Sequence, residues 1–349
     1  MDIGIDNMEQ GGASMNGKLK LIQVGLGGHG RGVGREFVLK SPDFEYAGLV
    51  DISIEALEQF AEQNHLSKEL LHTDYNDAFR KVKADAVLIE AISPVHYSIC
   101  KAALENGLHV LVEKPFVQSM REAEELVQLA GKKDLRIMVN QNYRFFATVA
   151  TLKQTLQDEP VGKLQFISAE FFCDHDGKPY QRAMKDYILL EMSVHHIDMI
   201  RYLLDADIVS VRGTTWNTPG SGYSGDPNVH AFYKTDRGIS ASYVSSLTAA
   251  GARMAWEGKW RIQCEYGAVH LDDLGSGYGV YIVDRKCRIT KLPLLIPEHE
   301  GIHGTLAEFA QSIREHREPI SSGRDNMKTL SALLATSKSS EEGTEIRIL

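Results

Sequence analysis

Short apolar runs alternate with amphipathic segments between Lys18 and about Asn140. A run of four or five apolar residues is typical of a buried parallel strand, whereas apolar residues spaced three or four apart indicate a helix. The pattern predicts strands at Leu19–Val24, Tyr46–Val50, Ala86–Ala91, Val110–Val112 and Ile137–Val139, with helices at Arg35–Lys40, Ile54–Gln63, Tyr97–Asn106 and Arg121–Lys132. Such strict alternation predicts a parallel sheet wound on both faces.

The pattern changes after about Phe145, where β-rich segments separated by turn residues predominate. Helices are predicted at Thr148–Gln157 and Tyr187–Leu204, followed by strands at Val209–Thr215, Val229–Tyr233, Ser240–Ser246, Trp260–Cys264, Ala268–Leu271 and Gly279–Val283, and by helices at Thr305–His316 and Asn326–Ser340. Strands joined by short turns favour an antiparallel sheet. We expect an α/β protein with a disordered extension (1–17), a doubly wound domain (18–142) and an α+β domain with a large open sheet (143–349), whose closing helices could pack back on the first domain.

Composition and charge exclude several classes of function. The formal net charge of −9, with scattered basic residues, argues against nucleic acid or an anionic membrane as partner. No apolar run approaches the roughly eighteen residues that span a bilayer, and the polar N-terminus lacks the features of a signal peptide. The four cysteines form no Cys-x-x-Cys motif and indicate a reducing compartment. We expect a cytoplasmic protein.

A glycine-rich segment follows the first predicted strand and opens a helix. Gly25, Gly27 and Gly30 form G-x-G-x-x-G, with Gly28 and His29 between them. In this context the glycines let the backbone approach a pyrophosphate, and the helix N-terminus offers unpaired N–H groups to the phosphates. Asp51 ends the second strand, where a carboxylate accepts hydrogen bonds from the adenosine ribose and repels a 2′-phosphate. The segment predicts a dinucleotide site that prefers NAD to NADP.

An apolar run that begins at Leu108 is followed by Glu113-Lys114-Pro115, at the carboxyl end of a predicted strand. Ligands of open α/β sheets bind just outside such ends. Because a residue before proline is held in extended backbone, Lys114 gains a preferred direction.

The predicted helix Tyr187–Leu204 carries a second group of candidate residues. Glu191, His195 and Asp198 are spaced to lie along one helical face. A histidine with a carboxylate one turn before it suits acid–base chemistry, although a structural histidine is the alternative interpretation. Adjacent histidines point about 100° apart on a helix, so His195 and His196 are poor joint ligands and we expect no metal.

Several segments together resemble the Gfo/Idh/MocA family, which includes glucose–fructose oxidoreductase and inositol dehydrogenases. The segments are the glycine loop, Ser93-Pro94-Val95-His96, Ala102–Val110 leading into Glu113-Lys114-Pro115, Glu191-x-Ser193-x-His195-x-x-Asp198, Phe309-x-x-x-Ile313 and Pro319–Gly323. The resemblance covers Lys18 to Leu349. It implies a Rossmann domain and a second domain whose open sheet is often used for oligomerisation, so we expect a homodimer or homotetramer.

The resemblance also implies roles for individual residues. It implies that Lys114 contacts the substrate oxygen and the nicotinamide ribose, and that His195 is the acid–base group. Ser93, His96, Asn142 and Arg144 match segments close to the cofactor. Two positions depart from the family's usual Asp-x-Gly-x-His, because this chain has Glu191 and Ser193 there.

The function expected from these residues is NAD-dependent oxidation of a secondary hydroxyl of a sugar, inositol or related polyol, or reduction of the matching ketone. His195, oriented by Glu191, takes the hydroxyl proton, and Lys114 stabilises the negative charge on oxygen. The loop before the helix either lines the pocket or is a solvated charged loop; its candidates are Asp174, His175, Asp176, Arg182, Lys185 and Tyr187. Two alternatives are an NAD-dependent glycosidase that uses transient oxidation and a non-catalytic protein that senses NAD or sugar.

Overall fold

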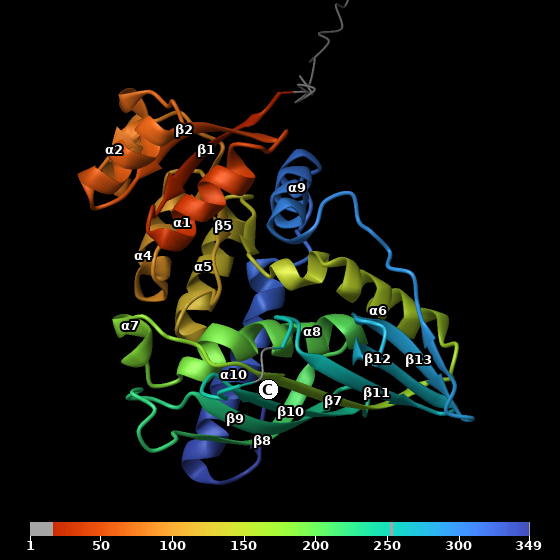
Figure 1. The fold of residues 1–349 in the computed structure, drawn as a ribbon. Helices are drawn as coiled ribbons and strands as arrows, with labels where there is room; N and C mark the ends of the chain where they lie inside the picture. Colours follow the sequence, from red (N-terminus) through yellow and green to blue (C-terminus); the bar gives the residue numbers. More distant parts are fainter. Residues whose placement is uncertain (1–16, 252–253, 349) are drawn as a thin grey trace, which may run out of the picture.

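The computed structural model describes residues 17–251 and 254–348, which form two sheets with helices packed on them (Figure 1). The predicted N-terminal extension lies outside the described residues except for Gly17. Within the described part of the chain, no helix combines the length and the apolar character needed to cross a membrane.

The first sheet has six parallel strands in the order β3-β2-β1-β4-β5-β6, which confirms the doubly wound α/β prediction. Its strands are β1 (Leu19–Val24), β2 (Phe44–Val50), β3 (Leu71–His72), β4 (Ala86–Ile89), β5 (His109–Val112) and β6 (Ile137–Val139). Its helices are α1 (Gly28–Val33), continued by a π-helical turn (Gly34–Val38), α2 (Ile54–Gln63), α3 (Tyr75–Lys81), α4 (His96–Glu105) and α5 (Met120–Lys132). The predicted helix Arg35–Lys40 overlaps the π-helical turn, but the helix begins earlier, at Gly28, because glycines at its start remove the apolar periodicity.

The second sheet has nine strands in the order β14-β13-β12-β11-β7-β10-β9-β8-β15. Only β7 and β10 pair in parallel, so the sheet is mainly antiparallel as expected. The strands are β7 (Leu164–Phe172), β8 (Ile208–Trp216), β9 (Asn228–Thr235), β10 (Ser240–Ser246), β11 (Lys259–Cys264), β12 (Gly267–Asp273), β13 (Tyr278–Asp284), β14 (Ile289–Lys291) and β15 (Ile346–Arg347). The sequence pattern did not identify β7, although this strand lies at the centre of the sheet.

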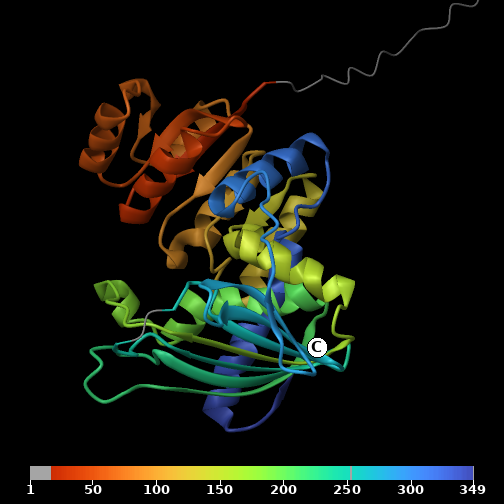
Figure 2. The same cartoon turned by 45° about the vertical axis from the view of Figure 1, so that its right-hand side comes forward.

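Helices α6 (Ala147–Asp158) and α8 (Val194–Leu204) cover the face of the second sheet that is turned toward the Rossmann domain (Figures 1 and 2). The predicted helix Tyr187–Leu204 is not regular, because Leu189–Ser193 form a π-helical turn immediately before α8. This turn changes the direction of the side chains that precede α8.

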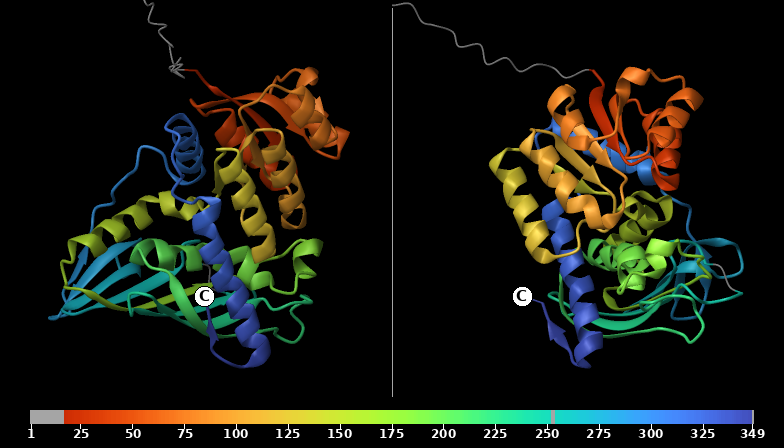
Figure 3. Two further views of the ribbon diagram at one scale, coloured as in Figure 1. Left: turned by 180° about the vertical axis from the view of Figure 1, so that it is seen from behind. Right: turned by 90° about the vertical axis from the view of Figure 1, so that its left-hand side faces the viewer.

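The last two helices connect the domains. Helix α9 (Gly301–Arg314) packs Leu306 and Phe309 against Leu21 and Phe44 of the Rossmann sheet. Helix α10 (Gly323–Glu342) contacts α5 of the first domain and then runs beside strand β8 (Figure 3). The C-terminal part of the chain therefore completes the core of the N-terminal domain.

Candidate active site

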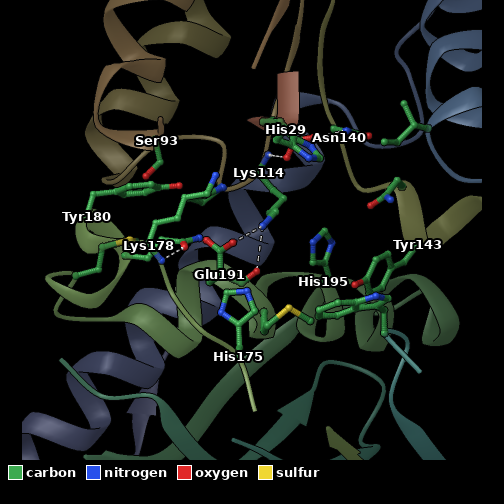
Figure 4. Close-up of a pocket in the computed structure, with 18 of the residues that line it drawn as sticks. His29, Ser93, Lys114, Asn140, Tyr143, His175, Lys178, Tyr180, Glu191 and His195 are labelled. Atoms are coloured by element: carbon green, nitrogen blue, oxygen red, sulfur yellow. Dashed lines mark hydrogen bonds and ion pairs between the residues drawn. The ribbon is translucent and has the colours of Figure 1, made fainter. Parts of the chain in front are cut away.

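A cavity of about 490 Å³ lies where the carboxyl ends of the Rossmann strands face α8 and the loop before it (Figure 4). Both domains contribute to its walls, and charged, aromatic and apolar side chains are mixed there. The lining residues are His29, Ser93, Glu113, Lys114, Pro115, Asn140, Asn142, Tyr143, Phe146, His175, Asp176, Lys178, Tyr180, Gln181, Met184, Glu191, Met192, His195, Trp256 and Ile302.

The glycine loop between β1 and α1 has room for a phosphate group. Gly25 has a φ of +99°, and a Cβ there would meet the backbone carbon of Glu90 at 2.7 Å. A Cβ on Gly30 would collide with the Gly25 oxygen, whereas positions 27 and 28 have open space above them. The first and third glycines are therefore needed for packing and the middle ones for close approach of a ligand, which fits a dinucleotide pyrophosphate.

Asp51 follows β2 at the same edge of the sheet. Its carboxylate accepts hydrogen bonds from the Leu26 N–H at 2.6 Å and the Ser53 N–H at 2.9 Å. These bonds fix the carboxylate beside the glycine loop, where the ribose of a bound adenosine would reach it.

Lys114 lies in a turn after β5 that buried His96 stabilises. The ring nitrogens of buried His96 lie 2.9 Å from the Pro115 oxygen and 2.9 Å from the Ala91 oxygen, so His96 joins the segments that follow β4 and β5. His96 does not line the cavity. Its two contacts give it a structural role in positioning Lys114, and its predicted contact with the cofactor stays a prediction.

The Lys114 side chain points across the cavity to the second domain (Figure 4). Its Nζ lies 3.1 Å from the backbone oxygen of Glu191 and 3.5 Å from Glu191 Oε1. Burial alone would lower the pKa of Lys114, but the negative charges of Glu191 and Glu113 raise it above its usual value. The lysine is therefore held as a cation inside the cavity.

The predicted Glu191–His195 pair is not formed. Glu191 lies in the π-helical turn, and its carboxylate contacts Lys114, whereas His195 Nδ1 is buried without a hydrogen-bond partner. The expectation assumed a regular helical spacing, which the turn disrupts. Instead, the His195 ring stacks on Tyr143, with centroids 4.1 Å apart and planes at 11°.

His195 is suited to accept a proton. Burial first, and the nearby charge of Lys114 second, lower the pKa of its imidazole well below the usual value. A neutral imidazole offers one nitrogen lone pair to a hydroxyl proton.

Arg144 and Asp198 lie behind the cavity wall rather than in it. The Arg144 guanidinium binds Asp198 through Nε at 2.7 Å and Nη2 at 2.6 Å, and Nη2 also lies 2.6 Å from Asp325. The arginine and Asp198 side chains are only 4% and 1% exposed. The donors of Arg144 bind carboxylates of α8 and α10, which gives the arginine a structural role, and its predicted contact with the cofactor stays a prediction.

The loop before α8 contributes only some of the expected residues to the lining of the cavity. Tyr187 is fully buried, with its hydroxyl 2.7 Å from His175 Nδ1, and Arg182 donates to the Gly177 oxygen and to Asp176. Neither residue lines the cavity, and both stabilise the loop; their predicted contacts with the substrate stay predictions. The exposed Lys185 also lies outside the cavity, whereas His175 and Asp176 line it.

Five of the predicted cofactor residues line the cavity, namely His29, Ser93, Glu113, Lys114 and Asn142. Sequence reasoning missed several others, among them Asn140, Lys178, Tyr180 and Trp256. Asn140 carried a usable signal, because it immediately follows a predicted strand. Trp256 carried none, because it lies in a loop whose path depends on the folded second sheet.

Glu90 was also missed, and it lies directly beneath the glycine loop. Its side chain is fully buried, and His29 Nε2 lies 3.5 Å from Glu90 Oε2 and 3.6 Å from Glu113 Oε1. Among the residues that the structure describes, these three side chains place ligand atoms within 4.8 Å of one another, a spacing that would also admit a small cation.

Comparison with known proteins agrees with this architecture. Residues 19–141 match the model of an oxidoreductase family with an NAD-binding Rossmann fold, and residues 149–270 match the GFO/IDH/MocA C-terminal domain. The chain belongs to the Gfo/Idh/MocA family. Together the two matches cover most of both domains.

Relatives within the Gfo/Idh/MocA family include several enzymes acting on sugars and cyclitols. The chain is 24% identical to scyllo-inositol 2-dehydrogenase (NAD(+)) of Bacillus subtilis, over 96% of this chain and 97% of the relative. It is also 24% identical to D-apiose dehydrogenase of Paraburkholderia graminis, over 78% of this chain and 76% of the relative.

Solved structures of the family share the fold at lower identity. An Agrobacterium radiobacter oxidoreductase, in complex with NAD+, L-tartaric acid and magnesium, superposes with a TM-score of 0.85 at 18% identity, covering 95% of this chain and 98% of that one. The aldose-aldose oxidoreductase of Caulobacter crescentus gives 0.83 at 18% identity, covering 95% and 99%. These structures support the fold assigned to both domains.

Proposed function

We propose that the protein is an NAD-dependent dehydrogenase that oxidises a secondary hydroxyl of a sugar, inositol or related polyol, or reduces the matching ketone. The observation that carries this proposal is the placement of Lys114 and His195 in one cavity beside the glycine loop (Figure 4). A cationic donor and a neutral base next to a dinucleotide site are the groups that alcohol oxidation requires.

Each residue has a separate task in this proposal. His195 accepts the hydroxyl proton, and the ammonium of Lys114 stabilises the negative charge that develops on the same oxygen. Bound NAD would accept the hydride from the carbinol carbon, which leaves a ketone. Glu191 acts as a positioning residue, because its carboxylate and backbone oxygen hold Lys114 Nζ.

A ring-shaped polyol suits the lining of the cavity. Trp256 is 43% exposed and stacks on Phe171, with ring centroids 5.8 Å apart, so its other face can pack against the C–H face of a sugar or cyclitol. His175, Asp176 and Lys178 provide polar atoms for hydroxyl groups. The activities of the relatives described above point to the same substrate class.

NAD is the preferred cofactor in this proposal. Two backbone N–H groups fix the Asp51 carboxylate beside the glycine loop. In that position it accepts hydrogen bonds from the two ribose hydroxyls of NAD and repels the 2′-phosphate of NADP.

The open face of the second sheet supports a homodimer or homotetramer. Strand β9 alternates buried and exposed positions, and Phe232 is 40% exposed on the face away from α6 and α8. Its ring stacks with that of Phe166 on β7, across the intervening strand β10, with centroids 6.5 Å apart. An apolar patch on an open sheet is a surface that a second copy would cover.

The central experiment uses purified protein, NAD and a panel of inositols, aldoses and acyclic polyols, and it follows the absorbance of reduced cofactor. We expect turnover with a cyclic polyol and loss of that turnover in Lys114→Ala and in His195→Ala. Wild-type turnover in both variants would refute the assigned chemistry. Release of a chromophore from a glycoside without net cofactor reduction would instead identify the glycosidase alternative.

A further inference from the structure

The carboxylate of Glu90 accepts no hydrogen bond from the residues that the structure describes, although it is deeply buried. Both of its oxygens are inaccessible, its side chain is 0% exposed, and the nearest cationic group is His29, whose Nε2 lies 3.5 Å from Oε2. Buried polar groups without partners are rare in native proteins and call for an explanation such as a ligand. Glu90 follows β4 at the edge of the sheet where the cofactor binds.

A second carboxylate lies beside it. Glu113 follows β5, accepts a hydrogen bond from Asn140 and lies 3.6 Å from His29. Burial first, and the negative charge of Glu113 second, raise the pKa of Glu90 well above its usual value. The pKa of Glu113 is instead lowered, because burial, which would raise it, is outweighed by the effects of His29, Lys114 and Asn140. A further positive charge placed next to the pair would favour the ionised form of Glu90.

The sheet order shows which part of a dinucleotide approaches these carboxylates. The glycine loop follows β1, and Asp51 follows β2 on the adenosine side. A dinucleotide bound across the reversal of strand order extends from there over β4 and β5, so its nicotinamide half lies over Glu90 and Glu113. Oxidised nicotinamide carries one positive charge and reduced nicotinamide carries none.

We propose that Glu90 and Glu113 form an anionic seat beneath the nicotinamide that makes the protein bind NAD+ more tightly than NADH. This inference rests on the proposed function, because it takes the glycine loop as the dinucleotide site. The seat adds a contact that differs between the two oxidation states, whereas the pyrophosphate and adenosine contacts are the same in both. It favours release of the reduced cofactor after each oxidation.

The experiment measures the dissociation constants of NAD+ and NADH by calorimetry and by nucleotide fluorescence, in a buffer with chelator and without substrate. Glu90→Gln keeps the side-chain shape and removes the charge, and the exposed Glu45→Gln serves as the matched control. We expect the preference for NAD+ to fall by about tenfold in Glu90→Gln and to stay unchanged in Glu45→Gln. Melting temperatures of each variant establish that the protein tested is folded, and Glu113→Gln gives a second test of the same seat.

The outcomes separate this inference from the proposed function. Suppose that the wild-type protein binds both nucleotides, and that Glu90→Gln and Glu113→Gln each keep the wild-type preference for NAD+ over NADH. The anionic seat is then refuted and the dehydrogenase proposal stands. If the preference appears only after addition of a divalent metal ion to chelator-free protein, a metal rather than nicotinamide occupies the group, which also refutes the seat. If the wild-type protein binds neither nucleotide, both proposals fail.

Discussion

Lys114 and Glu191 contact each other across the boundary between the two domains, with Nζ 3.1 Å from the backbone oxygen and 3.5 Å from Oε1. The side chains are 16% and 24% exposed, so solvent screens the pair only in part. This contact assigns Glu191 to the lysine and leaves His195 to be held by stacking on Tyr143.

Replacing Glu191 with Gln should shift the alkaline limb of activity to lower pH. The negative charge of Glu191 opposes the effect of burial on Lys114, so its removal lowers the pKa of the lysine and makes it neutral sooner as the pH rises. The pH profile of kcat/KM tests this, with the 90%-exposed Glu298→Gln as control. An unchanged alkaline limb would contradict the role given to Glu191.

His195→Asn should lower kcat by about a hundredfold or more while leaving NAD affinity unchanged. Burial and Lys114 depress the pKa of His195, so the wild-type base stays neutral and active as the pH falls through 6.5. The acid limb of kcat/KM should therefore lie below that pH and disappear in the variant. An exposed histidine, His230, provides the control His230→Asn. An acid limb at or above 6.5 would exclude His195 as the titrating base.

Asp51→Asn should reduce the preference for NAD over NADP by about tenfold, because it removes a like charge from the site of the 2′-phosphate. The amide keeps one oxygen to accept a backbone hydrogen bond. Ratios of kcat/KM for the two cofactors measure the change. An unaltered ratio would show that another residue sets the preference.

Arg144→Met should destabilise the protein by about 3–5 kcal/mol, because it removes the two-pronged ionic partner of buried Asp198 and leaves only the longer, 4.0 Å ion pair with Arg201. Urea unfolding measures the free energy of unfolding, and calorimetry at low temperature measures NAD binding by the folded variant. We expect a large loss of stability and an unchanged dissociation constant. The opposite result would restore Arg144 to the cofactor site.

Stability should fall between pH 7 and pH 5, partly through His196. Burial lowers the pKa of this histidine from 6.5 to about 4, so below pH 6.5 the unfolded chain takes up a proton that the native protein does not. The resulting loss is about 2 kcal/mol over this range. His196→Gln should lose about that much less between the two pH values in urea unfolding. Equal losses in both proteins would mean that His196 is not buried in its neutral form.

Much of the first domain could be predicted because its signals are local. The apolar runs of β1 and β5, the glycine loop and Asp51 each depend on a few consecutive residues. Strand β3 was missed because a two-residue strand has no period to detect, and the seven-residue helix α3 that follows it was missed as well.

The site was harder to predict because its contacts join distant segments. The π-helical turn at Leu189–Ser193 leaves no trace in apolar spacing, yet it determines that Glu191 reaches Lys114. Arg144 lies in a segment that matches the family, but its partners Asp198 and Asp325 come from helices far along the chain. A charged residue at the end of a strand, such as Glu90, is expected to face solvent, and only the packed sheet shows that Glu90 is buried.

The packing of α9 has a consequence for synthesis of the protein. Leu306 and Phe309 cover Leu21 and Phe44. During translation, Leu21 and Phe44 leave the ribosome long before Leu306 and Phe309 are made. While the second sheet is being made, the nascent first domain keeps part of its apolar surface open. It reaches its final packing only when almost the whole chain has been translated, so the order of translation delays completion of the cofactor domain until the substrate domain exists.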